Sequence, residues 1–150
     1  MEFGPISLFG AIIVVLMLIP NIVYAIRHRG ERNICDNEFM NVIEAIGRYA
    51  CIILMWLPLF NFGFPNVLAF IIYAAGNGIM LIAYWVLFAI YMKKRTRGLA
   101  LALAILPTCI FLLSGLTLRN WLLVFFAVLF GVGHIYVTLE NAEEEESAEE

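Results

Sequence analysis

The sequence has few charged residues. Of its 150 residues, 14% are Asp, Glu, Lys or Arg, whereas 63% are hydrophobic, and the mean hydropathy is +0.93. A soluble domain carries about a quarter charged residues, so this composition excludes a water-facing surface of ordinary size. The scarcity of charge therefore predicts an integral membrane protein.

Cysteines and metal ligands are also scarce. Cys35, Cys51 and Cys109 lie far apart, include no C-x-x-C pair and are odd in number, which argues against a disulfide framework and against thiol–disulfide enzymes. We interpret them as small apolar core side chains. A zinc site needs three or four convergent ligands, which one histidine within an apolar run and scattered cysteines do not supply. We expect no metal and no cofactor.

The motifs of membrane hydrolases are missing as well. The G-x-S-x-G turn is absent. From the helical rise, Ser114 should lie about 6 Å and His134 about 20 Å from the outer membrane edge, so the two side chains lie at different depths and cannot form a catalytic pair. A carboxylate–metal site would need more acidic residues than Glu44. The sequence therefore predicts a protein that is not an enzyme.

Apolar runs long enough to cross a bilayer recur along the chain. The first follows no Lys or Arg and lacks a small-residue cleavage site, so we expect a retained helix and not a signal peptide. The fold class predicted is an all-α integral membrane bundle of five transmembrane helices in one domain over residues 1–140, with an acidic, disordered, cytoplasmic tail over 141–150. The expected spans are 4–26, 42–60, 67–92, 98–117 and 121–139.

A polar stripe runs into the beginning of the second span. Asn37, Asn41, Glu44 and Arg48 are separated by four, three and four residues, so they share one face of a helix. Asp36 is the expected N-cap. This pattern predicts a short amphipathic beginning that lies at the membrane interface before the helix enters the bilayer.

Positive charge is distributed unevenly between the connecting loops. The second and fourth loops hold only Arg119. Under the positive-inside rule, the first and third loops are cytoplasmic, the N-terminus is outside and the C-terminus inside. The same basic loops are expected to attract anionic lipids. Their basic residues are Arg27, Arg29, Arg32, Lys93, Lys94, Arg95 and Arg97.

Several polar residues share one depth in this topology. From the helical rise, Asn21 lies about 9 Å, Tyr84 about 10 Å and His134 about 8 Å inside the cytoplasmic edge. Glu44 and Arg48 enter the second span from the same side. Because polar groups in a bilayer are costly and usually face the bundle interior, we expect a polar cluster or a shallow cavity open to the cytoplasm, a candidate binding site.

Each of these residues also has a purely structural interpretation. Glu44 and Arg48 form a favourable i,i+4 pair that needs no function. Asn21 can bond to backbone loosened by the kink at Pro20, or across helices. His134 can be a packed, hydrogen-bonded histidine.

Two classes of function remain open. The first is a non-catalytic membrane protein: an accessory, regulatory or immunity-type partner, or a binder of a lipid or small ligand. The alternative is a transporter of ions or small solutes, with Glu44 as a proton or cation site and Asn77 near the membrane midplane. Five short helices enclose little volume, so a transporter would need a homo-oligomer. No nucleic-acid partner is expected.

Three short segments, 20–26, 46–49 and 130–134, resemble the recurring pattern of a group of small multi-pass membrane proteins from Gram-positive bacteria. The similarity extends over residues 18–142. The group has no assigned activity, so the resemblance implies the bacterial inner membrane, a multi-pass cell-membrane location, and nothing about chemistry. Three of the polar residues above lie in these segments: Asn21, Arg48 and His134.

Overall fold

The computed structural model describes residues 7–31, 33–57 and 59–149. Within these residues the chain forms five helices, each long and apolar enough to cross a membrane. The predicted all-α class and the five membrane-spanning lengths are confirmed. The helices are α1 (Leu8–Arg27), α2 (Glu38–Trp56), α3 (Val67–Tyr91), α4 (Arg97–Thr117) and α5 (Trp121–Glu149).

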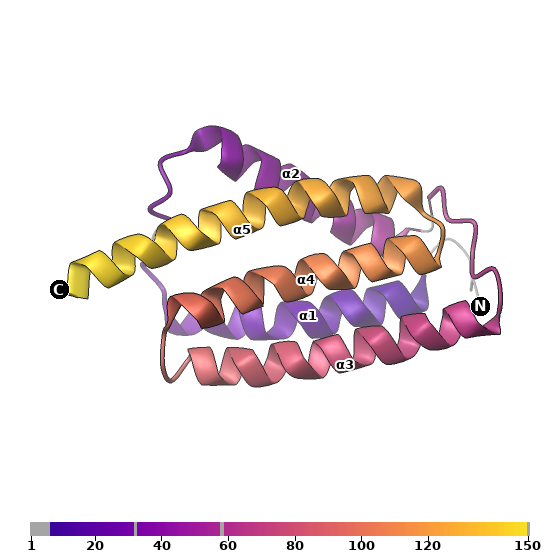
Figure 1. Ribbon diagram of the computed structural model, residues 1–150, viewed down its shortest axis with the longest axis horizontal. Helices are drawn as coiled ribbons and strands as arrows, with labels where there is room; N and C mark the ends of the chain where they lie inside the picture. Colours follow the sequence, from indigo (N-terminus) through magenta and orange to yellow (C-terminus); the bar gives the residue numbers. More distant parts are fainter. Residues whose placement is uncertain (1–6, 32, 58, 150) are drawn as a thin grey trace.

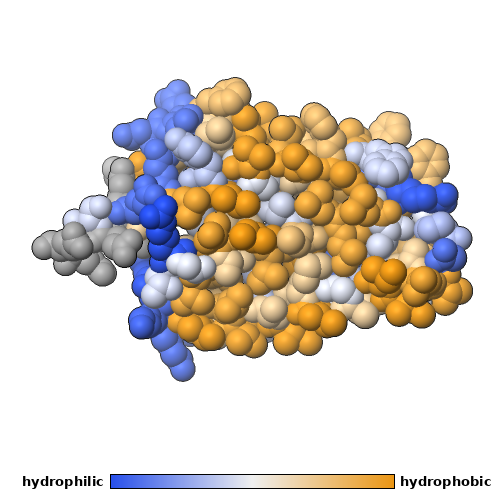
Figure 2. Space-filling view, in the orientation of Figure 1, coloured by the Kyte–Doolittle hydropathy of each residue, from blue (hydrophilic) through white to orange (hydrophobic). Residues whose placement is uncertain are grey.

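The helices run along one long axis, and successive helices point in opposite directions (Figure 1). We call the end that holds the α1–α2 connection, the α3–α4 connection and the C-terminus the basic end. The opposite end holds the α2–α3 and α4–α5 connections. Figure 2 shows a broad hydrophobic band between hydrophilic residues at the two ends, most of them at the basic end. Arg32 and residues 4–6 of the first predicted span lie outside the described residues.

Helix α5 packs closely against α2 and α4, and α3 packs against α4. Helix α1 is held more lightly. It meets α2 at the opposite end, where Ser7 N donates to Trp56 O at 2.7 Å. A Cβ on Gly10 would lie 2.0 Å from Met55 O, so glycine is needed for this contact. From there α1 and α2 diverge towards the basic end (Figure 1).

Two glycines bring α2 and α5 into backbone contact. A Cβ on Gly47 would lie 2.6 Å from Phe130 N, and one on Gly133 would lie 2.7 Å from Glu44 N. Small residues allow membrane helices to approach this closely. The approach sets Glu44 of α2 beside α5.

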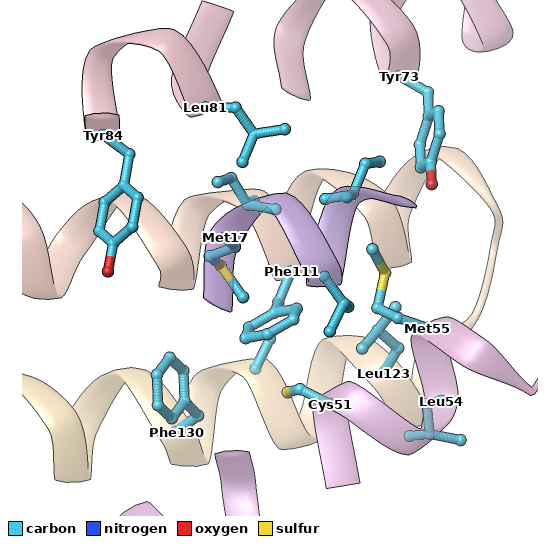
Figure 3. Close-up of a cluster of buried hydrophobic side chains, with 14 of the residues drawn as sticks. Met17, Cys51, Leu54, Met55, Tyr73, Leu81, Tyr84, Phe111, Leu123 and Phe130 are labelled. Carbon is cyan, nitrogen blue, oxygen red and sulfur yellow. The ribbon is translucent and has the colours of Figure 1, made fainter. Parts of the chain in front are cut away.

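The core fills the space between the helices (Figure 3). Met17, Met55, Phe111 and Leu123 are buried side chains from α1, α2, α4 and α5. Cys51 is fully buried in this apolar cluster, in line with its interpretation as a small core side chain.

The structure differs from the sequence-based expectation at both ends of α2. Its N-cap is Asn37, not Asp36: Asn37 Oδ1 accepts from Met40 N at 3.1 Å. Asp36 is one residue too early for a helix that begins at Glu38. Helix α2 ends at Trp56, before the end of the predicted second span, 42–60, because Leu57 adopts an extended conformation (φ −97, ψ 122), as is typical before a proline.

The acidic segment is helical where the sequence predicts disorder. Helix α5 continues through Glu149, although residue 150 lies outside the described part. Alanine and glutamate are strong helix formers, and no glycine or proline follows Gly133 in the sequence. Arg97 at the start of α4 pairs with Glu143, which ties this extension to the bundle.

Candidate functional site

A cleft opens among the helices towards the basic end. Its inner part, about 170 Å³, is lined by α1, α3, α4 and α5, and its polar lining residues are Asn21, Tyr24, Tyr84, Tyr91, His134 and Thr138. An outer part of about 260 Å³ is lined by residues that include Glu31, Asn33 and Asn141. The two parts share four lining residues, so they form one continuous cleft. The shared residues are Tyr24, Tyr91, Ala100 and Thr138.

A proline kink positions Asn21 and Tyr84. Pro20 has no N–H to donate to Leu16 O, and Trp85 Nε1 from α3 donates to that carbonyl at 2.9 Å instead. Asn21 Nδ2 donates to Met17 O at 2.9 Å and to Tyr84 OH at 2.8 Å. Asn21 thus donates both to the backbone of its own helix and to a side chain of α3. These are the two structural roles expected for it from the sequence.

Glu44, Arg48 and His134 form a second cluster across α2 and α5. Glu44 Oε1 accepts from Arg48 one turn away. The same oxygen lies 2.7 Å from His134 Nδ1, and because a carboxylate only accepts, Nδ1–H is the donor. The His134 ring also stacks on Phe130, with centroids 4.7 Å apart.

The two clusters lie on different walls of the inner cleft. Asn21 and Tyr84 line it from α1 and α3, and His134 lines it from α5. With Nδ1 committed to Glu44, Nε2 is the His134 nitrogen available to a molecule in the cleft. Glu44 is only 8% exposed, and its contacts place it behind His134. It orients the ring and does not line the cleft.

Asn77 lies away from this site. It is buried in the α3–α4 interface, where Nδ2 donates to Ser114 Oγ at 3.1 Å. Its Oδ1, and the Tyr73 hydroxyl one turn earlier, have no hydrogen-bond partner among the described residues. The candidate site predicted from sequence therefore divides into a cleft region and a separate buried asparagine.

The mouth of the cleft holds an ion pair that the sequence-based reasoning missed. Arg95 Nη2 donates to Glu31 Oε1 at 2.6 Å, and Tyr24 OH donates to Glu31 Oε2 at 2.7 Å. Burial of Glu31 disfavours its charge, but the hydrogen bonds from Arg95 and Tyr24 outweigh burial, so the pKa of this carboxyl lies below its ordinary value. Glu31 and Arg95 are 64 residues apart in the sequence, so no local sequence pattern predicts their contact.

The α1–α2 connection is fastened to the extension of α5 beside the outer cleft. Asn141 Oδ1 accepts from Ile34 N at 2.9 Å and from Cys35 N at 3.1 Å. Cys35 Sγ donates to Glu140 Oε2 at 2.7 Å. Burial and then this hydrogen bond raise the pKa of the Cys35 thiol, so the group is a protonated structural donor and not a reactive thiolate.

The described basic residues of the α1–α2 and α3–α4 connections lie at the same end. Arg95 and Arg97 are ion-paired with Glu31 and Glu143. Among the residues that the structure describes, no group of three His, Cys, Asp or Glu side chains could hold a metal ion. The cleft can therefore offer hydrogen-bonding groups and aromatic walls to a bound molecule.

Comparisons with protein-family models, with curated proteins and with solved structures found no match to this chain. The resemblance to a group of small multi-pass proteins from Gram-positive bacteria stays a prediction.

Proposed function

We propose that this chain is a small non-catalytic protein of the cell membrane, an accessory or regulatory component that acts by binding a small amphipathic molecule in the basic-end cleft. One observation carries the proposal. Asn21, Tyr84 and His134 come from three helices and line one cleft within an otherwise apolar bundle. Ligand sites are typically concave and mostly apolar, with a few convergent polar groups.

The proposed orientation has the basic end in the cytoplasm. The excess of Lys and Arg in the α1–α2 and α3–α4 connections supports it through the positive-inside rule. The amphipathic beginning of α2 would then lie at the cytoplasmic interface, where Asn41 Nδ2 donates to Cys35 O at 2.9 Å. The cleft would open towards the cytoplasm and the inner leaflet, and the resemblance noted above points to a bacterial inner membrane.

The light packing of α1 supports a regulatory role. Helix α1 contacts α2 near Ser7 and Gly10, and the two helices diverge at the basic end (Figure 1). A molecule bound between Asn21 of α1 and His134 of α5 would stabilise one spacing of these helices. A partner protein that contacts both helices could detect that spacing.

A proton-linked transporter is the second candidate, and the Glu44–His134 pair favours it, because intramembrane ionisable groups often mark transport paths. The packing beyond the cleft favours the binder. Between Tyr84 and Tyr73, the cluster of Met17, Leu81 and Phe111 fills the bundle (Figure 3). These buried apolar side chains separate the cleft from the opposite end.

Native mass spectrometry of protein extracted gently from its own membrane tests the proposed function. We expect wild type to retain a small molecule in fixed stoichiometry, and Tyr84→Phe, which removes one cleft hydroxyl, to retain less of it. Trp121→Phe is the matched aromatic control, because Trp121 is exposed at the opposite end.

A second polypeptide in fixed ratio would support the accessory role. Identical spectra for wild type and Tyr84→Phe, with bulk lipid only, would contradict binding in the cleft.

A further inference from the structure

We propose that the molecule held in the basic-end cleft is an organic cation, and that the guanidinium of Arg95 occupies part of its site as a built-in competitor. The inference rests on the proposed function and adds the chemical class of the ligand.

The charge of the cleft lining favours a cation. Among the described residues, Glu31 is the one carboxylate that lines the cleft. No described lysine or arginine lines either part, although the connections around the cleft are rich in both. An anionic ligand would lie beside this carboxylate, and the Arg95 guanidinium at the mouth is already paired with Glu31.

Aromatic rings supply the second argument. The Tyr24, Tyr84, Phe88 and Tyr91 side chains all line the inner cleft. Phe88 lies at the centre of this group, with ring centroids 5.8 Å from Tyr24, 5.6 Å from Tyr84 and 6.5 Å from Tyr91. The face of an aromatic ring is negative and attracts cations, and groups of such rings recognise quaternary ammonium compounds.

Arg95 provides the third argument, because a cation already binds at the mouth. Its guanidinium carbon lies 5.5 Å from the centroid of the Tyr24 ring, and the same group pairs with Glu31. His28 also stacks on Tyr24, with centroids 4.3 Å apart. An incoming cation that uses Tyr24 and Glu31 must therefore displace Arg95.

The lining of the inner cleft favours a cation that carries apolar groups. Its apolar lining residues are Phe88, Ala100, Leu103 and Ala104. These side chains would contact the apolar part of the bound molecule.

The test uses the full chain in micelles of a nonionic maltoside detergent, which has no ammonium headgroup to compete, and two radiolabelled probes of matched shape, benzyltrimethylammonium and benzylsulfonate. Both carry a benzyl group on a tetrahedral head, and they differ in the sign of the charge. We expect saturable binding of one ammonium per chain and no saturable binding of the sulfonate.

Two variants separate competition from simple stabilisation. Glu31→Gln removes the carboxylate and should weaken ammonium binding about fivefold. Arg95→Gln removes the competitor and should strengthen it about fivefold. If the ion pair only supported the fold, both variants would change binding in the same direction, which would overturn the inference. Arg97→Gln is the matched control, because Arg97 pairs with Glu143 away from the cleft lining, and it should leave binding unchanged.

A pair of substitutions at Tyr24 tests the aromatic ring separately from the ion pair, in case the charge variants do not fold. Tyr24→Phe keeps the ring and should bind the ammonium more tightly than Tyr24→Leu, which removes it; equal affinities would contradict a role for the ring. Saturable binding of the sulfonate alone would overturn the cation inference and leave the proposed function standing. No saturable binding of either probe, with no retained molecule in native mass spectra, would overturn both.

Discussion

At the scale of single residues, Glu44 links the two helices at the site, because its carboxylate contacts both Arg48 of α2 and His134 of α5. It is the only buried charged residue among those described. Its two partners differ: the Arg48 side chain is 44% exposed, whereas that of His134 is 24% exposed. The bond to His134 joins α2 to α5, whereas Arg48 lies one turn away on the same helix and its long side chain can turn towards water at the interface. His134 should therefore matter more than Arg48 for stability.

The first prediction concerns this cluster. His134→Phe keeps a ring that can stack on Phe130 but leaves the Glu44 carboxylate without its donor from α5, and should lower the free energy of unfolding by about 1–3 kcal/mol. Arg48→Ala should cost less than about 1 kcal/mol. The double change Glu44→Leu with His134→Phe should cost less than His134→Phe alone, because no unpaired carboxylate remains. Denaturant unfolding in micelles measures all three, and strictly additive losses would refute the coupling.

A second prediction follows from Glu31, whose pKa is lowered in the folded protein from an ordinary value of 4.5. A carboxyl group with a lowered pKa stabilises the fold above its unfolded pKa, and the contribution disappears as pH falls through the folded pKa. The stability difference between wild type and Glu31→Gln should therefore be constant from pH 7 to about pH 4.5 and shrink at lower pH. Thermal unfolding across this range is the measurement. A difference that grows on acidification would contradict the Arg95–Glu31 pairing.

At the scale of elements, the contact between α2 and α5 decides whether the site forms. Gly133→Ala would press a methyl group against the Glu44 backbone and should destabilise the protein by about 1–3 kcal/mol. Gly78→Ala is the control, because nothing lies within 4 Å of a Cβ there, and it should be neutral or stabilising by up to about 1 kcal/mol. Similar effects of the two substitutions would argue against the close approach of these helices.

The elements themselves follow from local sequence, whereas their partners do not. Apolar run length predicts five helices, and Pro20 predicts a carbonyl in need of a donor, but nothing near Leu16 identifies Trp85 as that donor. The shared depth of Asn21, Tyr84 and His134 could be predicted because it depends only on helical rise. The Glu44–His134 bond spans 90 residues. Its one sequence signal is the pair of glycines, Gly47 and Gly133, which mark helix faces able to approach closely.

The prediction of disorder after residue 140 rests on composition alone. Acidic, low-complexity segments are often disordered, but Asn141 and Glu143 are fastened to the α1–α2 connection and to Arg97. These contacts extend α5 past the apolar run, and they depend on residues distant in sequence.

At the scale of the whole molecule, a membrane-embedded bundle that binds a ligand in the basic-end cleft should have that cleft filled with water and open to the cytoplasm. Thr138 lines both parts of that cleft. Val132, less than two turns earlier on α5, is 53% exposed within the apolar band and should face lipid. The two positions differ in their expected access to water.

Cysteine labelling in intact cells and in inverted membrane vesicles tests this requirement most directly. In a chain whose three natural cysteines are replaced by serine or alanine, Thr138→Cys should react with a membrane-impermeant maleimide in inverted vesicles and not in intact cells. Val132→Cys should react in neither, because the thiolate does not form in lipid. Labelling of Thr138→Cys from outside the cell, or equal protection of both positions from both sides, would contradict a cytoplasm-facing cleft.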